Sequence, residues 1–168
     1  MFVFGFQEIV ELKPVNILYS NNNDITISWK NFIEKSLFSD LNNITNNNKQ
    51  CKYTILHVSN LVGILLLVYV KKELLYNISI LNSKIIKFGL AGVLGNKGCL
   101  ILRFNYKLTS FAIVCAHLEA GLEKDCTRHN QIFKILNEKM SCPKTNDLLT
   151  INNKIEEYYS NIKKIKNF

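Results

Sequence analysis

LGNKGCLILRFNYKLTSFAIVCAH, residues 94–117, holds two apolar runs bounded by a glycine-rich segment and a histidine. Cys99–Tyr106 and Thr109–Ala116 are rich in β-branched and aromatic residues and are separated by a short connection. We therefore predict an antiparallel hairpin. Because strands of similar length return the chain to where it began, Gly98 and His117 should lie at the same end of that hairpin.

The segment Gly95-Asn96-Lys97-Gly98 has two interpretations. Glycines let main-chain amides approach an anion, and Lys97 adds a mobile positive charge, which together suit a phosphate group. The alternative is that the glycines only permit positive φ angles at the entry to the hairpin. A Walker-type phosphate loop is disfavoured, because no Gly-Lys pair is followed by Ser or Thr.

His117 also has two interpretations. A lone histidine at the end of an apolar strand can be a partly buried structural residue. It can equally belong to a site, because open α/β sheets assemble their sites at the carboxyl ends of strands. The apolar run Phe111–Cys115 precedes His117 and places it at such an end.

Two parts of the chain resemble the inositol polyphosphate 5-phosphatases, a branch of the DNase I-like endonuclease/exonuclease/phosphatase superfamily. One is Lys52 to about Leu136, which includes Leu61–Val70, the Gly89–Gly98 loop and the His117 strand; the other is Val3–Leu12. The resemblance implies an α/β fold, a partial four-layer α/β/β/α sandwich of the DNase I-like type.

The resemblance also implies site residues. It assigns His117 to catalysis at the scissile phosphate, Asn96 and Lys97 to substrate binding, and Glu8 to a magnesium ion. Glutamate oxygens suit Mg²⁺, which takes few carboxylates together with waters and substrate phosphates. Without the resemblance, Glu8 could be an acidic residue at a solvated strand-to-helix junction.

The chain departs from the family pattern in several places. Glu119 stands where alanine is common, and His129 occupies the position of an arginine, with Arg128 beside it. After Leu149-Thr150-Ile151 the family continues with Gly-Asp-x-Asn-Tyr-Arg, whose aspartate activates water, and this motif is not found here. We therefore expect residues 1–151 to form the N-terminal portion of a catalytic domain, with the C-terminal half missing and no activity from this chain alone.

The expected elements follow from periodicity and turn signals. Residues 152–168 read as a divergent Lys/Asn-rich tail, and residues 42–50 as a polar loop or insert. Strands are expected at 1–12, 52–58, 61–70 and 78–88. Helices are expected at 27–41, with Trp29, Phe32, Ile33, Leu37 and Leu41 on one face, and at 126–140, with Ile132, Ile135 and Leu136 on one face.

Composition sets limits on class and location. The 168 residues are 48% hydrophobic, enough for the core of one domain. A truncated sandwich should expose the apolar inner face of one sheet to solvent, so we expect poor solubility of this chain. Five cysteines without paired metal spacing suggest a reducing, cytoplasmic setting. No signal peptide is expected, and Leu61–Val70 is too short to span a bilayer.

The net charge of +8 suits an acidic partner, such as inositol phosphates or phosphoinositide headgroups, with peripheral membrane contact as a further possibility. Two function classes result. The first is a magnesium-dependent 5-phosphatase of inositol phosphates or phosphoinositides, and the second is a non-catalytic phosphoinositide-binding remnant. A nuclease of the same superfamily is the weaker third, so nucleic acid is not the expected partner.

Overall fold

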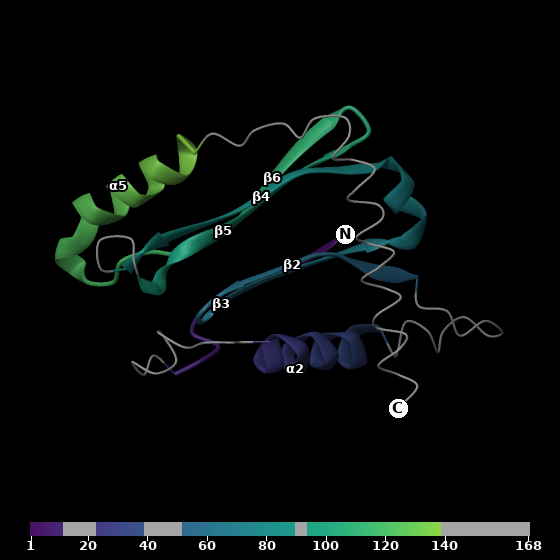
Figure 1. Cartoon of the computed structure of the whole chain (residues 1–168), viewed down its shortest axis with the longest axis horizontal. Helices are drawn as coiled ribbons and strands as arrows, with labels where there is room; N and C mark the ends of the chain where they lie inside the picture. Colours follow the sequence, from purple (N-terminus) through teal and green to yellow (C-terminus); the bar gives the residue numbers. More distant parts are fainter. Residues whose placement is uncertain (12–22, 39–51, 90–93, 139–168) are drawn as a thin grey trace.

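The computed structural model of the protein describes residues 1–11, 23–38, 52–89 and 94–138, and within them two antiparallel sheets pack face to face (Figure 1). One sheet has the order β1-β3-β2, formed by Phe2–Phe6, Ile64–Lys71 and Tyr53–Leu61. The other has the order β4-β5-β6, formed by Ile78–Phe88, Leu94–Tyr106 and Thr109–His117.

A helix covers the outer face of each sheet. Helix α2 (Asn23–Ile33) continues into the π-helical turn η1 (Glu34–Phe38) and lies on the β1-β3-β2 sheet, whereas α5 (Asp125–Leu136) lies on the β4-β5-β6 sheet (Figure 1). Two short 3-10 segments, η2 (Lys72–Asn77) and η3 (Leu122–Lys124), connect strands and helices. The layer order is therefore α/β/β/α, which confirms the predicted fold.

Strand β3 forms the centre of the core because both of its faces are covered. Its inner side chains, including Leu66 and Val68, pack against Leu100 and Leu102 of β5. Its outer side chains Leu65, Leu67 and Tyr69 pack under Ile33 of α2. A continuous apolar run without polar alternation is the pattern of a strand buried on both sides, and it explains the sequence of residues 64–70.

The strand predictions are confirmed in order and pairing. The two predicted strands of 52–58 and 61–70 are neighbours, and 78–88 is a strand with the predicted bounds. The hairpin forms as predicted, with Gly98 paired opposite His117. Several boundaries differ: β1 ends at Phe6, β2 continues to Leu61 and β3 begins at Ile64. β5 begins at Leu94, so the glycine segment belongs to the strand and does not form a turn before it.

Both helices begin earlier than predicted, α2 at Asn23 and α5 at Asp125, and α5 ends at Leu136. Their inward faces also differ from the prediction. Ile33 is buried and Trp29 packs against the same cluster, but Phe32 is 63% exposed. In α5, Ile135 packs on the sheet, whereas Ile132 and Leu136 are exposed, so the predicted shared face is wrong. The predicted extensions to 41 and 140, the polar loop 42–50 and the tail 152–168 lie outside the described residues.

Three cysteines fall in the described residues, and all three are free thiols. Cys99 and Cys115 are buried, and burial raises the pKa of both, that of Cys99 to about 11. A thiol that stays protonated is a poor nucleophile and a poor metal ligand. These two cysteines therefore act as small core residues.

His57 is a half-buried titratable group in the inner face of β2. It pairs opposite Val68, and its Nε2 atom has no hydrogen-bond partner among the described residues. Burial lowers the pKa of His57 below its ordinary value of 6.5. The unfolded chain therefore binds a proton more readily than the folded chain in the pH range just below 6.5.

The free energy of unfolding should consequently fall as the pH drops below about 6.5, with a slope of at most about 1.4 kcal/mol per pH unit from His57. His57→Phe, which cannot take up a proton, should reduce this slope while leaving the part contributed by His117. Urea denaturation of both proteins at pH 5, 6 and 7 measures the slope. Equal slopes in the two proteins would contradict this assignment.

Strands β1 and β6 are edge strands that lie on the same side of the sandwich, and neither carries a charged residue apart from the terminal His117. Val3 of β1 is 43% exposed and Val114 of β6 is 45% exposed. The edge strand β4 differs, because it carries Lys84 and Lys87. Charged side chains protect an edge from pairing with other chains, so β1 and β6 lack the protection that β4 has.

Val114→Lys should therefore increase the soluble concentration of the chain several-fold, because it places a charge on the unprotected edge. Ile85→Lys is the matched control, since Ile85 is 47% exposed on the edge strand β4, which already carries lysines. Light scattering against protein concentration measures the difference. If both substitutions change aggregation equally, the β1/β6 edge is not its cause.

Candidate functional site

The candidate site lies where β1, β5 and β6 end at one rim of the sandwich. His117 is the last residue of β6 and pairs opposite Gly98 of β5. Gln7 follows the last residue of β1 and donates a hydrogen bond from Nε2 to the main-chain oxygen of Ala116, at 2.6 Å. This bond joins the two sheets and brings Glu8 to the same rim.

His117 contacts a cation and an anion. Its Nε2 atom lies 2.8 Å from Nζ of Lys97 and 3.5 Å from Oε1 of Glu8. The His117 side chain is 9% exposed, whereas the Glu8 side chain is 66% exposed. Three of the four predicted site residues therefore meet around a single imidazole nitrogen.

The surroundings keep this imidazole neutral. Burial lowers the pKa of His117, the positive charge of Lys97 lowers it further, and Glu8 acts in the opposite direction. An ammonium group has donors only, so Lys97 donates to Nε2 and the proton of the neutral ring lies on Nδ1. In the site without ligand, the ammonium group of Lys97 is therefore bound to Nε2 of His117, a weak acceptor that a ligand can replace.

Glu8 adopts an unusual main-chain conformation, with φ of 56°. Such an angle is uncommon outside glycine and needs support from its surroundings. The turn between β2 and β3 provides that support: the amide of Ile9 donates to the carbonyl of Gly63 at 3.2 Å. A Cβ atom on Gly63 would lie 3.5 Å from Cα of Glu8, so this turn packs directly against it.

The positive-φ interpretation is wrong for Gly95 and Gly98, whereas the approach of main-chain amides to an anion stays a prediction. Among the described residues, Gly121 alone of the glycines has positive φ. A Cβ atom on Gly95 would lie 2.7 Å from both Leu61 and Val62, and one on Gly98 would meet Leu61 and the carbonyl of Ile86. These glycines allow the two sheets to approach each other closely at the end of the sandwich where Lys97 and His117 lie.

Asn96 is placed differently from Lys97. Its Oδ1 atom is buried without a hydrogen-bond partner among the described residues, and it lies against Gly89. Its side chain makes no described contact with His117. A buried unpaired acceptor is costly unless a donor reaches it, so Oδ1 of Asn96 can accept a hydrogen bond from a water or from a ligand hydroxyl group.

Glu8 fits a divalent cation in part. Its carboxylate is exposed, and hard oxygen donors are what Mg²⁺ prefers. The neighbouring imidazole is neutral, so it does not repel a cation. However, the described residues contain no group of three or more His, Cys, Asp or Glu side chains that could hold a metal ion. One carboxylate must therefore be complemented by substrate oxygens, waters or other groups.

Two supports of the site were missed from the sequence. Gln7 was recognised only as part of a motif, and its bond across the sheets depends on tertiary packing. The turn formed by Val62 and Gly63 was not recognised, although two apolar strands separated by two residues signal a hairpin. Val62 has φ of 48°, as tight hairpin turns require.

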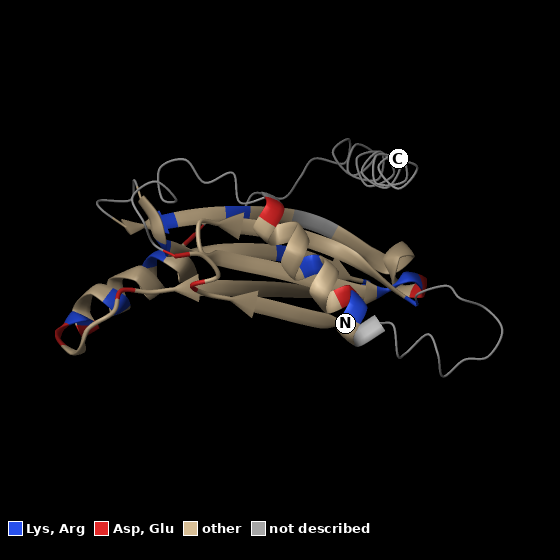
Figure 2. Ribbon diagram, turned by 90° about the horizontal axis from the view of Figure 1, so that it is seen from below, with Lys and Arg blue, Asp and Glu red and all other residues tan. Residues whose placement is uncertain are grey.

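The remaining charges are dispersed. Figure 2 shows Lys and Arg positions spread over α2, α5 and the strands, without gathering on one element. In the part of the chain that the structure describes, no helix has the length and apolar character needed to cross a membrane.

Comparisons with known proteins agree with this geometry. The chain is 32% identical over 163 residues to a Schizosaccharomyces pombe protein named as a probable inositol polyphosphate 5-phosphatase, covering 89% of this chain and 13% of that protein. It is 29% identical to the type IV inositol polyphosphate 5-phosphatase 9 of Arabidopsis thaliana, covering 88% of this chain and 38% of that protein. The chain thus spans well under half the length of these relatives.

A solved structure is similar as well. It is the inositol polyphosphate 5-phosphatase domain of a synaptojanin in complex with inositol (1,4)-bisphosphate and a calcium ion. The TM-score is 0.61 at 28% identity, over 77% of this chain and 34% of that one. The model of endonuclease/exonuclease/phosphatase family 2 matches residues 1–164. The two-sheet sandwich, the rim around His117 and this match together show that the chain belongs to the endonuclease/exonuclease/phosphatase family 2.

Proposed function

We propose that this chain carries the phosphate-binding part of an inositol polyphosphate 5-phosphatase site. The observation that supports it most is the cluster around Nε2 of His117, with the Lys97 ammonium at 2.8 Å and the Glu8 carboxylate at 3.5 Å. The names of the similar proteins supply the substrate class, inositol phosphates or phosphoinositides.

In the proposed mechanism, a phosphate group takes the ammonium of Lys97 as its donor. A phosphate oxygen is a stronger acceptor than a neutral imidazole, so the Lys97 bond to Nε2 is exchanged for a charge-assisted one. Once Lys97 has left Nε2, His117 must carry a proton on this atom, as the other neutral tautomer or as imidazolium, in order to donate a hydrogen bond to the phosphate. In that form it stabilises the charge that develops when water attacks phosphorus. Asn96 contributes a side-chain amide at the adjacent position of β5.

Glu8 is proposed to hold Mg²⁺ together with phosphate oxygens and waters. When bound, such an ion would polarise the phosphate and assist the leaving oxygen. Hydrolysis also needs a carboxylate that orients or deprotonates the attacking water. The described residues bring Glu8 to His117, and this one carboxylate is already assigned to the metal.

The test is binding and turnover by the 168-residue chain. We expect inositol 1,4-bisphosphate to bind in calorimetry, and His117→Ala to weaken binding about tenfold or more, since a buried hydrogen-bonding partner of the ligand is lost. No phosphate release from an inositol lipid phosphorylated at position 5 is expected with Mg²⁺ present. Turnover that His117→Ala abolishes would contradict this expectation.

Two further outcomes separate the alternatives. If inositol 1,4-bisphosphate does not bind at all, the proposed phosphate-binding function is wrong. If the chain cleaves a DNA oligonucleotide with Mg²⁺ while inositol 1,4-bisphosphate has no effect, the nuclease alternative gains the support. Binding to vesicles containing a phosphoinositide, compared with free inositol 1,4-bisphosphate, distinguishes a lipid from a soluble ligand.

A further inference from the structure

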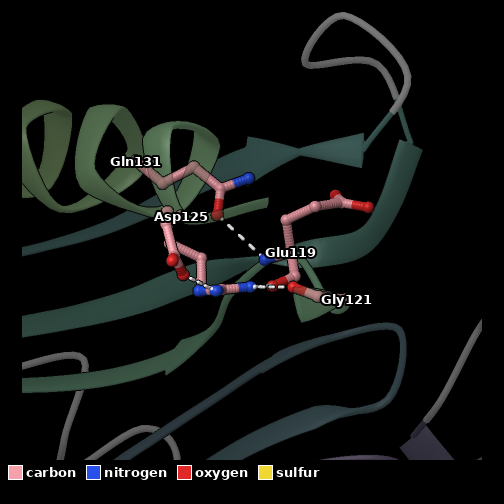
Figure 3. Close-up of polar contacts among 5 residues, drawn as sticks. Glu119, Gly121, Asp125 and Gln131 are labelled. Carbon is pink, nitrogen blue, oxygen red and sulfur yellow. Dashed lines mark hydrogen bonds and ion pairs between the residues drawn. The ribbon is translucent and has the colours of Figure 1, made fainter. Parts of the chain in front are cut away.

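The turn that follows His117 is held by two side chains of α5. Gln131 accepts a hydrogen bond through Oε1 from the amide of Glu119 at 2.9 Å (Figure 3). Arg128 donates from Nη1 to the carbonyls of Glu119, at 3.2 Å, and Gly121, at 2.6 Å. Both main-chain polar groups of Glu119 are therefore bound to α5.

The arginine is itself fixed in place. Its Nη2 atom donates to Asp125 in an ion pair at the start of α5. The planar guanidinium has a rigid fork of donors, so it can bind two carbonyls and a carboxylate at the same time. The Arg128 donors are directed at these protein oxygens. Arg128 therefore binds the main chain and is not directed at a substrate phosphate.

The glutamine is a buried part of the same contact. Gln131 is 8% exposed, one of the few buried polar side chains among the described residues. A buried amide oxygen left without a donor is costly, so the bond from the Glu119 amide is strongly favoured. The Glu119 carboxylate, in contrast, points away from Gln131 and Asp125 (Figure 3).

These contacts begin where the sheet hydrogen bonds end. His117 is the last paired residue of β6, and Gly121 already has φ of 110°, a conformation outside any strand. The ends of strands fray unless other contacts hold them. Arg128 and Gln131 supply such contacts within four residues of His117, from a helix on the outer face of the same sheet.

We propose that Arg128 and Gln131 are positioning residues for His117. They bind the main chain beyond β6 to α5 and so keep the imidazole against Lys97, although neither touches that pair. The effect on ligand affinity rests on the phosphate-binding function proposed above, whereas the effect on the position of His117 does not.

Gln131→Met and Gln131→Glu test the contact as a pair. Methionine keeps the length of the side chain and removes the acceptor, whereas glutamate keeps an acceptor oxygen. With Gln131→Met we expect amide exchange at Glu119 to be about 10- to 100-fold faster and the amide signals of His117 and Lys97 to shift in ¹H–¹⁵N spectra. Gln131→Glu should retain most of the wild-type protection and signal positions.

Arg128→Ala is the second variant, because Arg128 is less buried than Gln131 and its removal is less damaging to folding. It should shift the same His117 and Lys97 signals, and Arg128→Lys should restore them only in part, since a single ammonium cannot span both carbonyls. Asn130→Ala, on the exposed side of α5, and Glu119→Ala, which keeps the main chain, are the controls.

The affinity for inositol 1,4-bisphosphate should fall about five- to tenfold with Gln131→Met and Arg128→Ala, and remain near wild type in both controls. Signal changes confined to residues 119–131, with His117 and Lys97 unmoved, would overturn the proposal. Failure of the wild-type chain to bind inositol 1,4-bisphosphate would reject the proposed function alone, because the spectra still decide whether α5 positions His117.

Discussion

Lys97→Met should weaken the binding of inositol 1,4-bisphosphate by about 10- to 100-fold without unfolding the chain. The expected size is that of one charge-assisted hydrogen bond, about 1.5 to 3 kcal/mol. Lys97 contributes the ammonium group that lies nearest to His117, at 2.8 Å from Nε2. Methionine preserves most of the side-chain length and packing, so the loss reports on the charge and its donors.

The control removes an equal charge from the opposite end of the molecule. Lys72 is exposed at the start of η2, which joins β3 to β4 at the end of the sandwich away from Gly98 and His117. Lys72→Met should change the affinity less than about twofold, because an exposed charge beyond the Debye length is screened. Similar losses for Lys72→Met and Lys97→Met would mean that net charge alone attracts the ligand.

A double-mutant cycle then tests whether the pair acts as a unit. Lys97→Met and His117→Ala should be non-additive, with the double variant losing less affinity than the sum of the two single losses, because neighbours that share a ligand group couple. Additive losses would indicate two independent contacts and contradict a shared phosphate position. Calorimetry of the four proteins at one salt concentration provides the measurement.

Local patterns in the sequence were sufficient to predict the strands and their hairpin pairing. Apolar and β-branched runs separated by short connections specify antiparallel neighbours, and the pairing of Gly98 with His117 follows from strand length. The inward faces of the helices were less predictable. Phe32 and Leu136 have the right spacing but are exposed, because only one side of each helix meets a sheet.

The proximity of three predicted residues is seen in the structure, but the contacts that support them were not predicted. The family resemblance pointed to Glu8, Lys97 and His117, and their side chains lie together at one rim. The positive φ of Glu8 and the bond from Gln7 arise between segments about 55 and 109 residues apart in sequence, where no local pattern can reveal them. The roles assigned to Glu8, Asn96, Lys97 and His117 all stay predictions.

The glycines of β5 show the same limit. In the sequence they suggested conformational freedom or an anion cradle, whereas Gly95 and Gly98 are extended residues that leave space for the opposite sheet. The contact is with Leu61 and Val62, more than thirty residues earlier. Close approach between sheets depends on the complete fold, so only the tertiary structure identifies this reason for glycine.

Gly98→Ala should consequently destabilise the fold by about 2 to 3 kcal/mol, the upper part of the range for overpacking a core. The added Cβ would meet the carbonyl of Ile86 in the neighbouring strand β4 and lie 2.6 Å from Cδ2 of Leu61 in the other sheet. A leucine can rotate, but a carbonyl within the β4-β5 ladder cannot move without disturbing the pairing. The loss is a large part of the roughly 5 to 15 kcal/mol of a typical domain.

Gly63→Ala is the matched control. A Cβ atom there would have its nearest neighbours at 3.5 Å, an ordinary contact, and the φ angle of Gly63 is not positive. Its free energy of unfolding should stay within about 0.5 kcal/mol of the wild-type value. Urea denaturation of the three proteins measures both changes, and equal midpoints for Gly98→Ala and the wild type would show that the sheets can separate to admit a methyl group.

Gly98→Ala should also change the geometry of the candidate site, because Gly98 pairs directly with His117 and follows Lys97 in the chain. Movement of β5 away from Leu61 would displace the lysine from the imidazole, so any folded fraction of Gly98→Ala should bind inositol 1,4-bisphosphate more weakly than wild type. Calorimetry below the unfolding transition separates the two effects. Unchanged affinity in a destabilised protein would mean that the glycine supports the fold alone, and that Lys97 and His117 are held in register by β6.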